Sequence, residues 1–440
     1  MRREKSRAII IPFIGGKDVM PITGYFGPYP HDYEGFPNYF TEDIFQKIAD
    51  AGINLMVYSA ADYHTQPEFV ETNLMFGEKY GVGVFVTDNS IVEGDGAQTI
   101  TAEVAIKKME LFKDRKAFCG MYVVDEPTAT YYCDTNGSRL ISKYEKASKV
   151  LQQDLNQLCY INLLPVINLE TETRVNYERY VNEFCDTLQP KVVLWDMYPF
   201  DKNREGKMEV YFYNMDVIRK AADDRNLPFW AFIQAGSQWN DNWNEFETTT
   251  PYFPNEEQFN WNVNTSLAFG AQGIQYFPLV QPYQFTITKE GDYECNGIIG
   301  AMGNKTQWYY YAQTVNRHIK AIDKVLMNST HKGVIASGEQ AKRDLEFTTC
   351  VIESESFNEL QSVSGNALVG CFNYQGKTAL YVVNHSFEHV QNIKLEFEGV
   401  QNLQVIQKAK EADVSTSELI LDMAAGEGIL IVIQQSRRRN

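Results

Sequence analysis

The sequence has few of the residues from which metal sites and disulfide frameworks are built. It contains 7 cysteines and 6 histidines among 440 residues, with no Cys-X-X-Cys pair and no His-Glu-X-X-His spacing. An odd number of scattered cysteines does not make a disulfide framework, so we expect mostly free thiols. Zinc sites need ligand spacings that do not occur here. We therefore expect no metal and no cofactor.

Positive charge and long apolar runs are also scarce. Lys and Arg number 40 against 57 Asp and Glu, which gives a net charge of −17. This balance argues against partners such as nucleic acid or an anionic membrane surface. No run approaches the roughly 18 apolar residues that span a bilayer, so we expect no membrane insertion.

The N-terminus contains a short apolar run, residues 8–11, which Pro12 interrupts. Such a run is too short for the core of a signal peptide. Two locations follow as expectations: cytoplasmic for the chain as it stands, or secreted or periplasmic if an export signal has been removed.

Eight apolar segments alternate with helical patterns through residues 1–330. Thr41, for example, is a suitable N-cap for a helix over 41–52. The alternation predicts an α/β fold, a (β/α)8 TIM barrel. The rival is a doubly wound open sheet, which usually carries a glycine-rich phosphate loop that is absent here. The expected strands are residues 19–28, 53–58, 82–88, 120–125, 158–165, 191–199, 227–234 and 271–277.

The pattern changes near residue 331. Short β runs follow one another, separated by turns rich in Gly, Asn, Glu and Ser. This spacing predicts a small C-terminal antiparallel β-sandwich domain over residues 331–436. Residues 437–440 form a basic tail, which we expect to be disordered. The expected β runs are 347–352, 367–373, 378–384, 393–398, 403–407, 418–422 and 429–433.

Polar and aromatic side chains stand at the ends of the predicted strands, and in a barrel these ends meet at one mouth. Carboxylates transfer protons, amides and phenols bind hydroxyl groups, and aromatic rings stack on sugars, so the set predicts a carbohydrate site. Core or loop packing explains most of the aromatic residues better than sugar binding does when each is taken singly. The candidates for substrate binding are Tyr25, Asp62, His64, Asp88, Asp125, Asn162, Tyr198, Gln234, Trp239, Trp243 and Tyr276.

Two carboxyl groups are needed to hydrolyse a glycosidic bond. Glu126, in the segment 120–127, is the expected general acid, because burial at a strand end and the neighbouring Asp125 both raise a pKa. Since strand side chains alternate, only one of these two acids is expected to point along the barrel axis. The plainer interpretation of both is a helix cap. Asp196 is the preferred second carboxylate, and Asp88 is the fallback.

A metal site assembled from the same acids is a further alternative. It would take its ligands from Asp88, Asp125, Glu126, Asp196 and His64. No metal-ligand spacing supports it.

Three stretches resemble the TIM-barrel glycoside hydrolases of the clan that includes β-galactosidases and cellulase-like enzymes. Residues 122–127, Tyr-Val-Val-Asp-Glu-Pro, resemble the strand-four motif in which Asn-Glu-Pro supplies the acid/base glutamate. Residues 196–199 are similar to a strand-six motif of related barrels. Residues 303–316 are similar to the segment that opens the last helix of β-galactosidase-like members. The resemblance implies a glycosidase with a trailing β-sandwich.

Two departures from the clan limit what the resemblance implies. Asp125 stands where the clan has Asn, and Gln234 stands where it has the nucleophilic Glu of strand seven. An amide is not a nucleophile, so only Glu126 is carried over. A loop acid, Glu245 or Glu247, is another possible replacement for the missing nucleophile.

Two hypotheses about function follow. The first is a glycoside hydrolase that cleaves an oligo- or polysaccharide, retaining or inverting, with Glu126 as general acid and Asp196 as nucleophile or base. The alternative is a catalytically silent carbohydrate-binding barrel. The expected partner in both is a carbohydrate, and the oligomeric state is not predicted.

Overall fold

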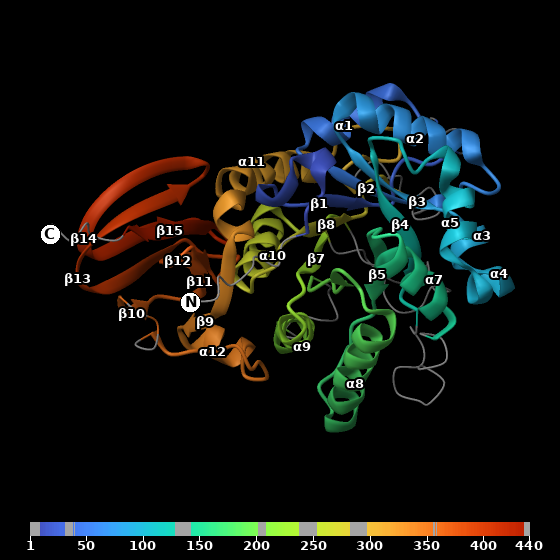
Figure 1. The fold of residues 1–440 in the computed structure, drawn as a ribbon. Helices are drawn as coiled ribbons and strands as arrows, with labels where there is room; N and C mark the ends of the chain where they lie inside the picture. Colours follow the sequence, from blue (N-terminus) through green and yellow to red (C-terminus); the bar gives the residue numbers. More distant parts are fainter. Residues whose placement is uncertain are drawn as a thin grey trace, which may run out of the picture.

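The computed structural model describes residues 9–30, 38, 40–127, 142–200, 208–236, 253–281, 297–354, 357 and 359–434. Eight parallel strands close into a barrel in the order β1 to β8, and a seven-stranded antiparallel sheet follows (Figure 1). The predicted α/β fold, a TIM barrel with a C-terminal sandwich-like β-domain, is confirmed. The barrel strands are β1 Ile22–Tyr25, β2 Leu55–Asp62, β3 Gly83–Thr87, β4 Phe118–Asp125, β5 Cys159–Leu163, β6 Val193–Trp195, β7 Phe229–Gln234 and β8 Ile274–Phe277.

Helices surround the barrel as the sequence pattern predicts. Helices lie between successive strands of the barrel along the chain, and α11 leads into the C-terminal domain. None of the helices in the described part of the chain is long and apolar enough to cross a membrane. The helices are α1 Glu42–Asp50, α2 Pro67–Tyr80, α3 Asn89–Val92, α4 Gly94–Thr99, α5 Ala102–Lys108, α7 Glu145–Lys149, α8 Thr171–Leu188, α9 Met208–Asp224, α10 Glu256–Ala268 and α11 Gln307–Met327.

Strand alternation divides the barrel residues into two apolar clusters. In β7, Trp230 and Phe232 belong to the cluster inside the barrel. Phe229, Ala231 and Ile233 belong to the larger cluster between the barrel and its helices. Because successive strand side chains point to opposite faces, one apolar run fills both layers. The interior is therefore a packed core, and chemistry is confined to its mouth.

The C-terminal sheet has the strand order β10-β13-β15-β12-β11-β9, with β14 paired to β13. The expected runs 393–398 and 403–407 are one continuous strand, and residues 347–352 contribute only an isolated bridge at Val351. The sequence pattern did not predict β9 or β10. The elements are β9 Ser329–Ser337, α12 Glu339–Asp344, β10 Leu360–Ser364, β11 Ala367–Tyr374, β12 Lys377–Asn384, β13 Gln391–Gln407, β14 Lys410–Met423 and β15 Gly428–Gln434.

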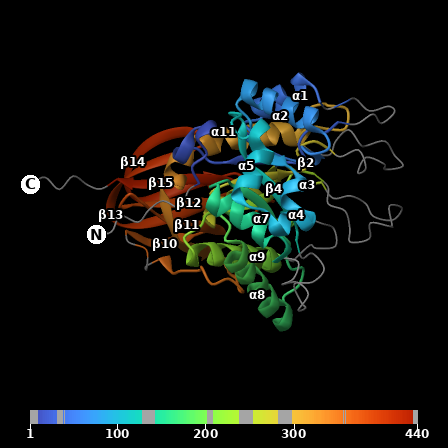
Figure 2. The same cartoon turned by 45° about the vertical axis from the view of Figure 1, so that its right-hand side comes forward.

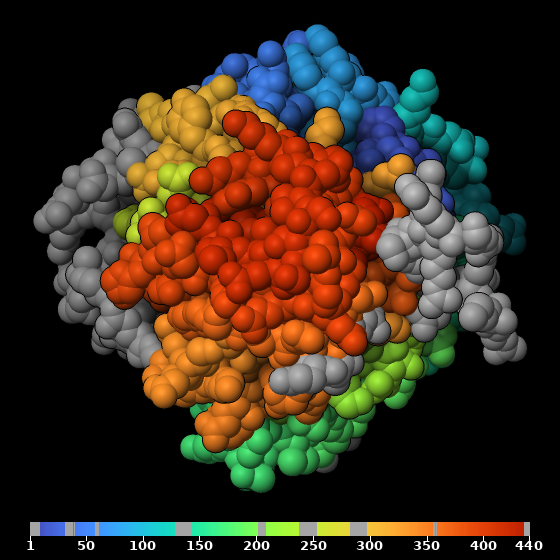
Figure 3. All heavy atoms as spheres, turned by 90° about the vertical axis from the view of Figure 1, so that its left-hand side faces the viewer, coloured from blue at the N-terminus to red at the C-terminus, as the bar shows by residue number. Residues whose placement is uncertain are grey.

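This sheet packs against α10 and α11, and its strands cover one side of the molecule (Figures 1, 2 and 3). Buried polar groups pair across the contact. Trp261 Nε1 donates to the His385 carbonyl at 3.0 Å, and Asn264 Nδ2 donates to the Gly426 carbonyl at 2.8 Å. Tyr381 donates its hydroxyl to Asn264 Oδ1 at 2.7 Å. Since α10 is buried by this sheet, the β-domain braces the barrel.

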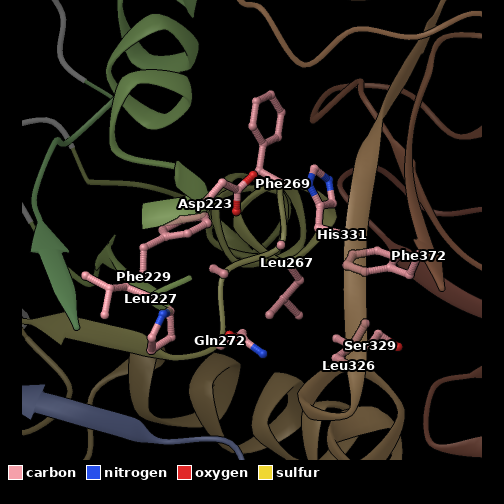
Figure 4. Close-up of a pocket in the computed structure, with 13 residues that line it drawn as sticks. Asp223, Leu227, Phe229, Leu267, Phe269, Gln272, Leu326, Ser329, His331 and Phe372 are labelled. Carbon is pink, nitrogen blue, oxygen red and sulfur yellow. The ribbon is translucent and has the colours of Figure 1, made fainter. Parts of the chain in front are cut away.

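A small cavity marks the junction of the two parts. It lies where the N-terminal ends of β7 and β8 meet β9, between residues that include Phe229, Gln272, His331 and Phe372 (Figure 4). His331 Nε2 lies 3.1 Å from the carbonyl oxygen of Ala268. The cavity is therefore at the opposite end of the barrel strands from the acids described below.

Candidate functional site

The end of β4 holds the acids that the sequence singled out. The pairing of β4 with β5 shifts register between Tyr122 and Val124, and beyond the shift Asp125 lies opposite Asn162. A β-bulge changes which face later side chains occupy. Glu126 then takes a left-handed backbone conformation, with φ of 46°, and its N–H donates to the Asn162 carbonyl at 3.0 Å.

The bulge and the left-handed turn correct one expectation. Regular alternation allowed only Asp125 or Glu126 to reach the barrel axis. Instead, both carboxyl groups join one cluster with Asp196, because the backbone departs from a regular strand at both places. A left-handed conformation at a residue other than glycine costs about 1 kcal/mol or more, and such strain is concentrated at functional sites.

A continuous chain of hydrogen bonds links side chains from four strand ends. Tyr25, from β1, donates its hydroxyl to Asp125 Oδ2 at 2.9 Å, and its oxygen lies 3.3 Å from the hydroxyl oxygen of Tyr122. Asn162, from β5, donates through Nδ2 to Asp125 Oδ1 at 3.0 Å and to Asp196 Oδ1 at 3.1 Å.

The chain ends in a pair of acids. The carboxyl groups of Glu126 and Asp196 hydrogen-bond to each other, and this contact raises the pKa of Asp196 and lowers that of Glu126, so Asp196 is the donor. Two ionised carboxylates have no hydrogen to share, so this contact requires one proton between them. The pair is therefore a proton-sharing carboxyl dyad.

Burial raises the pKa values of all three acids, and repulsion by neighbouring carboxylates adds to the rise at Glu126 and Asp196. The pKa of Glu126 is raised to about 7, first by burial and then by the charge of Asp125. The pKa of Asp196 is raised well above its usual range by burial, then by Glu126 and Asp125. Burial also raises the pKa of Asp125, while hydrogen bonds from Asn162 and Tyr25 oppose that rise. The cluster thus holds protons near neutral pH, as a general acid must.

Aromatic rings line the same region. Tyr122 and Tyr160 are stacked, with ring centroids 5.8 Å apart and planes 22° apart. The ring of Tyr198 packs against that of Phe277, with the ring centroids 5.5 Å apart. The pKa of Tyr160 is raised first by burial and then by nearby charges, which include those of Asp125 and Asp196. Its phenol therefore lies near these acids. The pattern of strand ends did not identify this tyrosine, although it precedes Asn162 by two positions on β5 and therefore lies on the same face of that strand.

Three predicted residues have local structural partners. Asp88 caps α3, because its Oδ1 accepts from the Ser90 N–H at 3.0 Å. Asp62 Oδ1 accepts from the N–H groups of His64 and Asn89, at 3.2 and 2.9 Å. The His64 side chain is exposed. Asp88 therefore acts as a helix cap in the observed contacts.

Two more predicted residues are fully buried with their polar atoms engaged. Gln234 accepts from the Phe200 N–H at 3.0 Å and donates to the carbonyls of Phe200 and Gly236 at 2.8 and 3.3 Å. Tyr276 donates its hydroxyl to Asn316 of α11 at 2.6 Å, so it faces the helical layer. Tyr198 and Asn162 lie at the acids, whereas Gln234 and Tyr276 hold the scaffold in this conformation.

Part of the predicted site lies outside the described residues. This applies to Trp239 and Trp243, and to the loop acids Glu245 and Glu247. Within the described ranges, no group of three or more His, Cys, Asp or Glu side chains is arranged to hold a metal ion.

Comparisons with known proteins give no sequence match but a clear match of fold. No protein-family model matches the chain, and neither does any curated protein. The structure of a β-galactosidase from Bacillus circulans sp. alkalophilus matches with a TM-score of 0.61 at 10% identity, covering 94% of this chain and 99% of that chain.

Two further structures are similar over most of this chain. A family 51 α-L-arabinofuranosidase from Bifidobacterium longum matches with a TM-score of 0.50 at 10% identity, covering 98% of each chain. A β-galactosidase from the psychrophilic Marinomonas ef1 matches with a TM-score of 0.49 at 11% identity, covering 72% of this chain and 63% of that chain. This chain therefore spans less than two thirds of the Marinomonas protein.

At such low identity a structural match establishes the fold. The resemblance to the β-galactosidase-like and cellulase-like barrels is thus confirmed at that level. The chain has the fold of TIM-barrel glycoside hydrolases, with a (β/α)8 barrel followed by a β-domain.

Proposed function

We propose that the protein is a glycoside hydrolase, with Glu126 as general acid and Asp196 as the second carboxylate. The observation that carries this proposal is the proton-sharing contact between these two acids at the ends of β4 and β6. A carboxyl group that retains its proton near pH 7 can deliver it to the leaving-group oxygen of a glycosidic bond. The phenols and rings around the pair suit a sugar.

The substrate has to separate the two carboxyl groups. Retaining enzymes hold them about 5–5.5 Å apart and inverting enzymes about 6.5–9.5 Å apart, and a direct hydrogen bond is shorter than either. Glu126 is half-buried, whereas only 8% of Asp196 is exposed. We therefore propose that Glu126 swings away from Asp196 when a sugar enters, which leaves the stereochemical outcome open.

The second candidate function is a catalytically silent carbohydrate-binding barrel. One observation favours it: Gln234 stands at the strand-seven position and its amide bonds only to backbone within the described structure. This residue supplies neither a nucleophile nor a free amide. The two candidates differ in whether a bound sugar is turned over.

A screen with variants tests the proposal. We would measure turnover of aryl glycosides and oligosaccharides by the full chain, by Glu126→Gln and by Asp196→Asn. The matched control is Asp323→Asn in α11. Burial raises the pKa of the Asp323 carboxyl to about 6, so this substitution also removes a buried acid with a raised pKa.

We expect turnover by the wild type and the control, with losses of about 10²- to 10⁴-fold in the Glu126 variant. Turnover that survives Glu126→Gln unchanged would refute the assignment. Sugar binding with no turnover by any form would favour the silent barrel.

A further inference from the structure

Three fully buried polar side chains come from adjacent strands of the barrel. Thr23 lies on β1, Gln275 on β8 and Trp230 on β7, and each is 0% exposed. Thr23 pairs in register with Gln275. Gln275 in turn pairs in register with Phe232, which follows Trp230 by two residues. Because neighbouring strands lie about 4.8 Å apart, these three side chains are neighbours in the wall of the barrel.

Alternation along each strand directs the three side chains inward. Tyr25, which follows Thr23 by two residues, belongs to the apolar cluster inside the barrel, as does Trp230 itself. Ile274 and Tyr276, on either side of Gln275, belong to the outer cluster. Since successive strand side chains point to opposite faces, Gln275 points into the barrel.

A glycine lets the indole nitrogen of Trp230 lie close to Gln275. A Cβ atom added at Gly273 would lie 2.7 Å from Trp230 Nε1, so the indole lies directly against the chain at this residue. Gly273 precedes Gln275 by two residues. Only a residue without a side chain leaves room for the ring there.

The polar atoms of this group have no hydrogen-bond partner among the described residues. They are Oγ1 of Thr23, Nε1 of Trp230, and both Nε2 and Oε1 of Gln275. Buried polar groups in native proteins are hydrogen-bonded, and each unsatisfied one lowers stability. Four such atoms on neighbouring side chains therefore indicate a shared partner.

The kinds of atom in the group identify that partner. Trp230 Nε1 and Gln275 Nε2 only donate, Gln275 Oε1 only accepts, and Thr23 Oγ1 does both. The N–H donors repel a metal cation, and apolar neighbours such as Leu55 and Leu194 make the interior unfavourable for an anion. The partner must be neutral, small, and able both to donate and to accept. Water has these properties.

We propose that the barrel interior contains a binding site for water, formed by Thr23, Trp230 and Gln275. Water there accepts hydrogen bonds from the indole and amide N–H groups and donates to the oxygens of Thr23 and Gln275. The site lies one layer below the acids, because Tyr25, which donates to Asp125, is the next residue on the same face of β1. This inference does not depend on the proposed function.

A high-resolution crystal structure of the full chain tests the proposal directly. We expect density for at least one water within hydrogen-bond distance of two or more of the four polar atoms. A direct hydrogen bond between Gln275 and Thr23, or an interior with no water at this place, would overturn the proposal.

Oxygen-17 relaxation dispersion of water counts long-lived internal waters of the full chain in solution. The double variant Thr23→Val, Gln275→Met removes three of the four polar atoms and keeps side chains of similar shape. We expect the double variant to lose at least one long-lived water relative to the wild type. An equal count in a folded double variant would overturn the proposal.

Gln152→Met is the matched control, because the amide of Gln152 is buried but bonds to protein groups. Its Nε2 donates to Ser148 Oγ at 2.7 Å and to the Leu188 carbonyl at 3.1 Å, and its Oε1 accepts from the Lys191 N–H at 3.0 Å. This variant should lower the melting temperature without changing the number of internal waters. A loss of water as large as in the double variant would count against the site, since general loosening of the fold would then explain both.

Discussion

Glu126 and Asp196, carried by the ends of β4 and β6, share a proton through a direct contact between their carboxyl groups. The arrangement stores unfavourable free energy, because the buried acids repel one another. Its effects on stability can be measured even where the substrate is not known.

Replacing Glu126 with Gln should stabilise the protein at pH 8 and not at pH 4. The folded-state pKa of about 7 lies above the ordinary value of 4.5. The folded state therefore binds more protons in this window, and the contribution of this carboxyl is present below about pH 4.5 and lost as pH rises through 7.

A glutamine avoids that loss, because its amide donates permanently to Asp196. The gain at pH 8 should be about 1–3 kcal/mol, given about 1.4 kcal/mol for each unit of pKa. Thermal unfolding at both pH values measures it, with the exposed Glu110→Gln as control. A gain of equal size at pH 4 would contradict the explanation.

Restoring an acid on strand seven should damage the fold and not create a nucleophile. Gln234→Glu loses the two donors that hold the Phe200 and Gly236 carbonyls and puts a charge at a fully buried position. We expect a loss of about 3 kcal/mol or more in the free energy of unfolding, measured by urea denaturation.

Gln258→Glu is the matched control for that substitution. Gln258 is the third residue of α10, and its side-chain oxygen accepts from the Asn255 N–H in a capping box. A glutamate accepts that bond equally well, so this substitution should lose less stability than Gln234→Glu. Increased turnover by a stable Gln234→Glu protein would show that the position is catalytic.

Tyr25→Phe should alter the pH dependence of activity. It removes the hydroxyl that donates to Asp125 Oδ2 at 2.9 Å, which helps to keep that acid ionised. The pKa of Asp125 should rise further, and turnover should fall by about tenfold, the cost of a hydrogen bond to a charged group.

Tyr381→Phe provides the comparison for this variant. Its hydroxyl donates to Asn264 Oδ1 at 2.7 Å, in the contact between the sheet and α10. Both variants should lose about 1 kcal/mol of stability, but only Tyr25→Phe should change the pH profile of kcat/KM. Identical profiles for the wild type and Tyr25→Phe would remove the tyrosine from the site.

His318 should make the docking of the β13–β14 hairpin sensitive to acid. Burial lowers its pKa from 6.5 to about 4, and its Nδ1 accepts from the Ala409 N–H at 3.3 Å. The unfolded state binds more protons between these values, so stability is lost as pH falls from about 6.5 to 4.

His318→Gln keeps an acceptor for Ala409 and does not titrate. Across this pH window, the wild type should lose up to about 3 kcal/mol relative to the variant. Melting temperatures of both proteins from pH 7 to 4 give the difference. Parallel curves would show that His318 does not carry this acid sensitivity.

The sequence alone predicts the barrel, the β-domain and the importance of the strand ends. Apolar runs such as that before Asp125 alternate with helical patterns, and burial of those runs allows few architectures. It also placed Glu126, Asp196, Asn162 and Tyr198 at one mouth, because parallel strands bring their C-terminal ends together.

Which of those side chains meet depends on how the folded chain packs. The bulge before Val124 and the left-handed Glu126 bring both acids of β4 to Asp196, and nothing in a local pattern of residues encodes that departure from alternation. The partners of Gln234 and Tyr276 come from distant segments, the loop after β6 and the helix α11. Hydrogen bonds between residues far apart in the chain depend on packing, so the sequence names the candidates and the fold assigns their partners.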